Sequence, residues 1–271
     1  MAEVVREATG FSEYPSLEKT SLYHGYKYIV AAATQFFRSC NWNGVARVFA
    51  ALAWEPIVSV WAGLDIRRGK VETFDLYGMN PTSLSLEQKR QSPILLLHGR
   101  DGSQGMFSAM GAFFKTEEMG PVFTVNLSDG ELTEDDYGVV NDKIEEIQKL
   151  YGEKIKIDLI GYSRGAELAF FMALPKEKWS MDGQGRCLMF PANEWRDEIG
   201  KIIRIGSVTL PKEWERITPA MRLSIYEIRG CDDLHMPERS EAIHCYEVEG
   251  VGHVGLVSSP LVFDRLKMIL S

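Results

Sequence analysis

Serine, acid and histidine side chains occur along this chain in an order and setting that suit nucleophilic catalysis. Ser163 lies in Gly161-Tyr162-Ser163-Arg164-Gly165, directly after an apolar run and before a helical pattern. A serine on such a strand-to-helix turn projects its hydroxyl away from the backbone, near a helix N-terminus where developing negative charge is stabilised. Glycine on either side lets neighbouring backbone pass without a Cβ clash. Ser163 is therefore the candidate nucleophile.

The candidate base is His253, because a serine hydroxyl becomes a useful nucleophile only when a base takes its proton. It follows the last predicted strand and lies in the glycine-rich loop 250–255. Three other histidines lie within a predicted strand, in the helical N-terminal stretch or behind the acid loop: His244, His24 and His235. His98 also ends a strand, but beside the expected oxyanion loop, where a structural hydrogen-bonding role is expected.

An acid that orients the imidazole and stabilises its protonated form would complete this set. The loop after the predicted strand 223–228 carries two neighbouring carboxylates, Asp232 and Asp233, and the local pattern leaves both open. The serine, acid, histidine order is the one found where the nucleophile follows a strand in a mainly parallel sheet.

Two backbone N–H groups are the expected donors to a negatively charged oxygen, an arrangement called the oxyanion hole. One belongs to Arg164, after the nucleophile, and the other to Arg100, in the loop after Leu97. Because both residues are arginines, one hypothesis is that a side chain of the pair contacts an anionic acyl or head group. The alternative is that both guanidiniums point to solvent or pair with acids such as Asp101.

The elements that must position these groups follow from the hydrophobic pattern of residues 91–271. Short, continuous apolar runs are typical of strands buried on both faces, and they predict strands at 93–97, 122–127, 155–160, 201–208, 223–228 and 243–248. Helices are expected between them, including one whose apolar face ends at Tyr151, one at 165–174, and one beginning at Ser259-Pro260. This alternation predicts a mainly parallel sheet, with the ligand site beyond the carboxyl ends of its strands.

Residues 1–90 differ from the rest, with long apolar helical patterns and one weak strand candidate at 70–76. They predict a largely helical N-terminal extension, or a cap, packed on the core. The apolar stretch 44–64 contains Arg47, Glu55 and Pro56, which disfavours a bilayer span. Attachment to a membrane surface is the alternative. The later segment 175–196 is expected to shape an acyl pocket or to pack against this extension.

Composition excludes some classes of function. The formal net charge of −8 and the lack of a basic tract disfavour nucleic-acid binding. The four cysteines form no Cys-x-x-Cys pair and have no histidine at metal-ligand spacing, so we expect neither a metal site nor a disulfide framework. No basic stretch followed by an apolar run opens the sequence, so we expect no signal peptide and a cytoplasmic location.

From about Ser92 to Ser271 the chain resembles compact α/β-hydrolases of the small bacterial lipase and esterase type. The matching motifs are His98-Gly99, Gly161-x-Ser163-x-Gly165, Gly230-x-x-Asp233-x-x-x-Pro237 and Gly252-His253-Val254-Gly255-Leu256. The last of them resembles small triacylglycerol lipases in particular. The resemblance implies an α/β-hydrolase fold and favours Asp233 over Asp232 as the acid.

The same resemblance implies hydrolysis of small-molecule or lipid esters through an acyl-enzyme, with neither cofactor nor metal. Two departures make a lipid substrate less secure than the ester reaction: the oxyanion loop reads Gly99-Arg100-Asp101-Gly102, and Arg164 stands where relatives often have an apolar residue. The alternatives are an acyltransferase or thioesterase with the same three residues, or a non-catalytic protein of this fold that binds a ligand or partner.

Overall fold

The computed structural model describes residues 84–175, 179–181, 187–189, 196–207, 224–231, 233 and 244–271. The predictions made for residues 1–83, a helical extension or cap and a strand at 70–76, lie outside the described residues. Within the described ranges, no helix combines the length and apolar character needed to cross a membrane.

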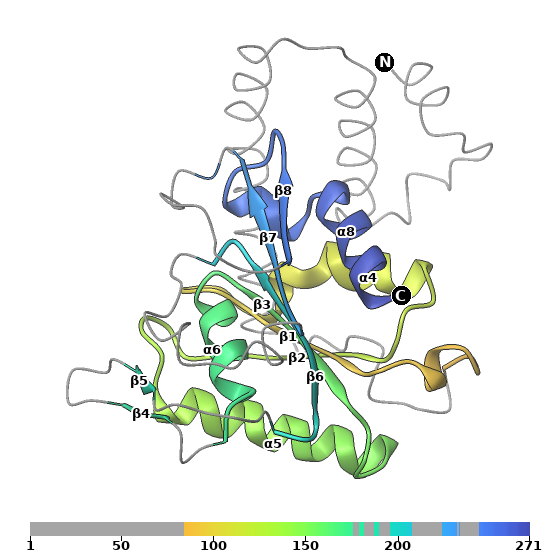
Figure 1. Ribbon diagram of the computed structural model, residues 1–271, viewed down its shortest axis with the longest axis vertical. Helices are drawn as coiled ribbons and strands as arrows, with labels where there is room; N and C mark the ends of the chain where they lie inside the picture. The colour runs from red at the N-terminus through yellow and green to blue at the C-terminus, as the bar shows by residue number, and fades with distance from the viewer. Residues whose placement is uncertain are drawn as a thin grey trace, which may run out of the picture.

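A sheet of six parallel strands forms the centre of the molecule (Figure 1). In sheet order the strands are β2 (Val122–Val125), β1 (Ile94–Leu97), β3 (Ile157–Tyr162), β6 (Ile199–Ile205), β7 (Ile225–Gly230) and β8 (His244–Val248). Each hydrogen-bonded pair in this sheet is parallel. Each of these strands lies within a few residues of its predicted range, and the predicted fold class, a mainly parallel sheet flanked by helices, is confirmed.

Helices cover both faces of the sheet (Figure 1). The elements are η3 (Gln88–Arg90), η4 (Gln104–Phe107), α4 (Ser108–Thr116), α5 (Glu134–Tyr151), α6 (Arg164–Met172), η7 (Val254–Val257) and α8 (Pro260–Leu270). Alternate residues of a strand point to opposite faces. In β1, Leu95 and Leu97 therefore join one apolar cluster with α5 and α6. Ile94 and Leu96 join a second cluster with α4 and α8.

A short hairpin lies within the segment 175–196, where no strand was predicted. Its strands β4 (Trp179–Met181) and β5 (Cys187–Met189) pair antiparallel. The remaining residues of this segment lie mainly outside the described part, so the expectation that it shapes an acyl pocket stays a prediction.

Helix α5 begins in a network of hydrogen bonds centred on the Asp136 carboxylate. Thr133 caps the helix through its side chain, which accepts the N–H of Asp136 at 3.3 Å, and the Asp136 carboxylate accepts the N–H of Thr133 at 2.9 Å. The same carboxylate accepts the N–H of Ser128 at 2.6 Å and its hydroxyl at 2.7 Å. Burial raises the pKa of Asp136, but these hydrogen bonds outweigh it and hold the pKa below its ordinary value.

Asp136→Asn is expected to lower the free energy of unfolding by about 2 kcal/mol at pH 7, because hydrogen bonds to a charged acceptor are lost. A carboxyl whose pKa is lowered by folding stabilises the folded state above its unfolded pKa of about 3.9, and this stabilisation is lost as the pH falls through the folded pKa. The difference in unfolding free energy between wild type and variant should therefore shrink as the pH falls below about 3.9. Urea unfolding at pH 7 and at pH 3 measures it, with the exposed Asp135→Asn as control; a pH-independent gap contradicts this account.

Candidate functional site

The turn between β3 and α6 carries Ser163 in a backbone conformation that L-residues rarely adopt. Ser163 has φ 52° and ψ −121°, and its N–H donates to the carbonyl of Ile205 on β6 at 2.8 Å. A non-glycine residue in such a conformation costs about 1–3 kcal/mol and persists only where its surroundings enforce it. The tight strand-to-helix turn predicted around Ser163 is therefore present.

The two glycines that flank this turn are required by close backbone packing. A Cβ on Gly161 would lie 2.1 Å from the carbonyl oxygen of Gly165. A Cβ on Gly165 would lie 2.1 Å from the carbonyl oxygen of Leu97, at the end of β1. The start of α6 thus packs directly on the strand that leads into the predicted oxyanion loop.

Asp233 and His253 form a hydrogen-bonded pair at the same edge of the sheet. The His253 Nδ1 lies 2.7 Å from the Asp233 Oδ2, and the aspartate side chain is fully buried while that of His253 is 16% exposed. Asp233 follows β7, whose last residue is Gly230, and His253 directly precedes η7. A carboxylate in this position accepts a hydrogen bond from Nδ1–H, so that in a neutral imidazole Nε2 is the acceptor nitrogen. The rival acid, Asp232, lies outside the described residues.

Two neighbours bracket the His253 ring beside the nucleophile turn. The Tyr162 hydroxyl donates to the His253 carbonyl at 3.2 Å, and the two rings lie 5.1 Å apart between centroids. A Cβ on Gly206, which has φ +56°, would lie 3.3 Å from the ring of His253. Tyr162 precedes Ser163 in sequence, and Gly206 follows the Ile205 carbonyl to which Ser163 donates. The imidazole is therefore held next to the serine turn.

Among the described residues the Ser163 hydroxyl makes no hydrogen bond, including to His253. The structure thus brings the predicted acid Asp233 and the predicted base His253 into contact, beside the turn that carries Ser163. Sequence reasoning missed the roles of Tyr162 and Gly206. The one signal for Gly206 was a glycine inside the predicted strand 201–208, near its end, whereas Tyr162, which precedes the serine in its motif, carried none.

The two predicted oxyanion donors are free in the described part of the molecule. Neither the N–H of Arg100 nor that of Arg164 donates to an atom of the described residues. A Cβ on Gly99 would lie 3.0 Å from the Cβ of Ser163, so the loop that carries Arg100 abuts the nucleophile turn. Asp101 follows with φ 54°, which turns this loop sharply. The arrangement leaves two backbone donors beside the serine.

His98 has the structural role expected from the sequence. Its ring is fully buried, its Nε2 accepts the N–H of Leu127 at 2.8 Å, and its Nδ1 lies 2.8 Å from the carbonyl of Gly99. Because Nε2 is an acceptor here, the proton must be on Nδ1, which donates to Gly99. His98 therefore ties the predicted oxyanion loop to the loop after β2.

The Arg100 side chain pairs with an acid, as one of the two expectations had it, whereas the Arg164 side chain bonds to main chain. Arg164 is only 4% exposed and donates to the carbonyls of Gly130 and Ser128, the latter at 2.6 Å. Arg100 pairs with Glu131, not with Asp101. The hypothesis that Arg164 contacts an anionic substrate group stays a prediction, and the burial of its guanidinium against main chain weighs against it. The alternative for Arg164, solvent or an acid, is wrong, because its side chain is buried and its partners are carbonyls.

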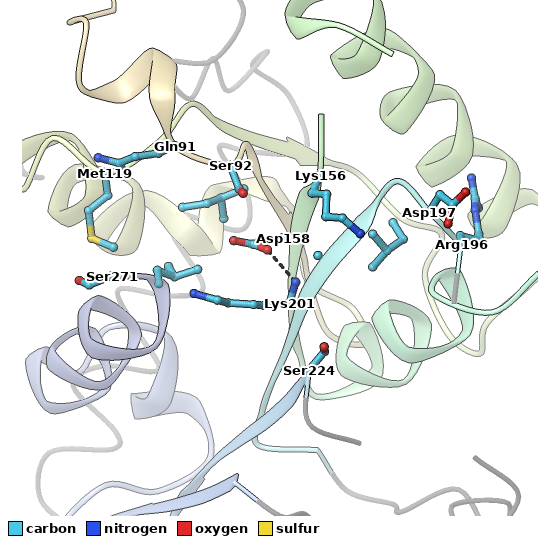
Figure 2. Close-up of a pocket in the computed structure, with 14 residues that line it drawn as sticks. Gln91, Ser92, Met119, Lys156, Asp158, Arg196, Asp197, Lys201, Ser224 and Ser271 are labelled. Carbon is cyan, nitrogen blue, oxygen red and sulfur yellow. Dashed lines mark hydrogen bonds between the residues drawn. The ribbon is translucent and has the colours of Figure 1, made fainter. Parts of the chain in front are cut away.

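A cavity of about 700 Å³ lies at the opposite edge of the sheet, where β1, β3, β6 and β7 begin (Figure 2). On its wall Asp158 accepts the N–H of Lys201 at 2.7 Å, and burial raises the pKa of this aspartate although Lys201 acts against it. None of the predicted site residues lines this cavity. Across the described ranges, no three His, Cys, Asp or Glu side chains gather to hold a metal ion.

Comparison of the chain with protein-family models and with curated proteins finds no match. Similar solved structures include the mature lipase BlEst2 of Bacillus licheniformis, at 11% identity and TM-score 0.48 over 72% of this chain and 96% of that one. A truncated carbohydrate esterase from gut microbiota has 14% identity and TM-score 0.46 over 66% and 85% of the two chains. An alpha-beta serine hydrolase homologue from Coxiella burnetii has 12% identity and TM-score 0.42 over 70% and 86%.

Proposed function

We propose that this chain, which has the α/β-hydrolase fold, is a serine hydrolase of carboxylic esters with Ser163 as nucleophile. The observation that carries the proposal is the hydrogen bond between Asp233 and His253, at 2.7 Å, beside a serine held at φ 52°. An acid–base pair of this kind can take the proton of a hydroxyl nucleophile within reach of the imidazole. Ser163 is the hydroxyl that the turn presents there.

In the proposed reaction, the Ser163 oxygen attacks the ester carbonyl carbon while Nε2 of His253 takes the hydroxyl proton. The negative charge that develops on the carbonyl oxygen is stabilised by the N–H groups of Arg100 and Arg164. His253 then gives its proton to the departing alcohol, which leaves Ser163 acylated. A water molecule then attacks the acyl carbon while His253 takes its proton, and His253 passes this proton to the Ser163 oxygen as the bond to the acyl group breaks and the carboxylic acid leaves. Asp233 holds the imidazole in the tautomer that this exchange requires.

The serine must bond to Nε2 before the first step, and in unliganded enzymes such catalytic hydrogen bonds are often long and shorten only in the substrate complex. The substrate in this proposal is a small-molecule or lipid ester that needs no negative charge. Support for this comes from Arg100 and Arg164, whose guanidiniums are engaged with Glu131 and with main-chain carbonyls.

Labelling with a fluorophosphonate probe tests the proposal, with Ser163→Ala as the matched control. We expect the wild type to be labelled and the variant to remain unlabelled, because the probe reacts with an activated serine at an intact acid–base pair. Hydrolysis of p-nitrophenyl esters of increasing chain length then measures the acyl preference. Equal labelling of both proteins, or labelling of neither, contradicts the proposal.

A further inference from the structure

The buried side chain of Arg164 holds the loop after β2 against the start of α6. We call residues 126–133 the β2–α5 loop. Arg164 donates through Nη1 to the carbonyl of Gly130 and through Nη2 to that of Ser128 at 2.6 Å. Ser128 is itself fixed by two hydrogen bonds to the Asp136 carboxylate. One guanidinium thus spans two carbonyls of a loop that is anchored to α5.

No carboxylate of the described residues lies within ion-pair distance of the Arg164 guanidinium. Its Nε is buried and has no partner in this part of the chain. An arginine remains charged in proteins, and burying a charge is costly unless it is well bonded. A contribution to stability therefore explains poorly why an arginine is buried at position 164, and a role in positioning the loop explains it better.

The β2–α5 loop also holds the other predicted oxyanion donor. The N–H of Leu127 donates to the ring of His98 at 2.8 Å, and the side-chain oxygen of Asn126 accepts the N–H of Gln104 at 2.9 Å. Glu131 forms an ion pair with Arg100, which also joins this loop to the segment 98–104. The loop therefore touches both ends of the segment 98–104 as well as α6, and it connects the two backbone donors.

We propose that the Arg164 side chain is a positioning residue that sets the separation of the two oxyanion donors through the β2–α5 loop. This inference rests on the proposed function. Oxyanion donors must lie about 2.7–3.1 Å from the charged oxygen, and a displacement of about 1 Å can lower turnover about 10²-fold. An arginine suits the task because its planar fork reaches two carbonyls at once, whereas lysine offers a single flexible ammonium.

Three variants test this inference: Arg164→Met, Arg164→Lys and, as control, Arg196→Met. Arg196 also carries a hydrogen-bonded guanidinium, which contacts the Tyr137 hydroxyl at 3.2 Å and the Asn141 side chain at 2.9 Å on α5. It lines the cavity at the opposite edge of the sheet. The control therefore removes an internal arginine without touching the β2–α5 loop.

For each variant we would measure kcat/KM on a neutral p-nitrophenyl ester, the rate and end-point of serine phosphonylation, and the urea unfolding midpoint. Arg164→Met and Arg164→Lys should both lower kcat/KM and the phosphonylation rate about 10–100-fold, with complete labelling at the end-point. Arg196→Met should alter both rates less than about threefold, even where its loss of stability is equal. If Arg164 has a purely structural role, the loss of rate in each variant should follow its loss of stability. If Arg164 positions the oxyanion donors, its variants should lose more rate than Arg196→Met at equal loss of stability.

The inference is overturned if Arg164→Met stays within threefold of wild type, or if all three variants lose activity in proportion to stability. Wild-type rates in Arg164→Lys would overturn it too. A positive charge at residue 164 would then maintain the rates without the two hydrogen bonds from one guanidinium to the carbonyls of Ser128 and Gly130. If the wild type itself resists phosphonylation, the proposed function fails and this inference falls with it. If the wild type is labelled and the rates of Arg164→Met are unaltered, this inference is wrong while the proposed function stands.

Discussion

Asp233→Asn is expected to lower kcat for ester hydrolysis about 10⁴-fold while leaving the fold intact. The buried carboxylate accepts a hydrogen bond from Nδ1–H of His253 at 2.7 Å, and so keeps Nε2 in the unprotonated form that can take a proton from serine. An asparagine amide has the same shape but can donate to Nδ1, which moves the ring proton to Nε2 and blocks this step. Esterase kinetics with a thermal unfolding curve for each protein measure the effect.

The neighbouring Asp232→Asn is the matched control, because the local sequence pattern leaves both carboxylates open. We expect it to retain activity within about threefold, because the carboxylate bonded to His253 Nδ1 is that of Asp233. Loss of activity in the Asp232 variant with retention in the Asp233 variant would contradict the assignment of the acid. Loss in both with lowered stability would point to a folding defect in this loop.

Gly165→Ala is expected to lower the free energy of unfolding by about 3 kcal/mol or more. The added Cβ would lie 2.1 Å from the Leu97 carbonyl oxygen and 2.6 Å from that of His98. Both are backbone atoms at the end of a central strand, so relief requires that α6 and β1 move apart. Overpacking of a well-packed core costs about 1–3 kcal/mol and occasionally more, and here the opposing atoms cannot rotate away. Urea unfolding measures the change.

Gly138→Ala is the corresponding control on α5. A Cβ at Gly138 would meet no atom within 4 Å. Alanine should therefore stabilise the protein by about 0.5–1 kcal/mol, because it lowers the entropy of the unfolded chain and favours the helix. A loss below about 1 kcal/mol in the Gly165 variant would show that the turn around Ser163 adapts more easily than its packing indicates.

Much of the fold follows from local pattern alone. The continuous apolar run before His98 predicts a strand buried on both faces, and each residue of Ile94–Leu97 is buried. The turn at Ser163 was also predictable, because a serine between close glycines at a strand end has few other uses. The residues at which strands and helices end were less predictable. The predicted strand 122–127 stops at Val125, since Asn126 and Leu127 bond to Gln104 and His98 instead.

Local pattern determined the strands, the helices and the serine turn of this protein, because periodicity and glycine spacing act over a few residues. The partners of the long side chains were decided by the tertiary structure alone. A guanidinium such as that of Arg164 can reach many groups, and only the packing of α6 against the β2–α5 loop selects the carbonyls of Ser128 and Gly130. The pairing of Asp233 with His253 arises in the same way, from neighbouring parallel strands that end at one edge.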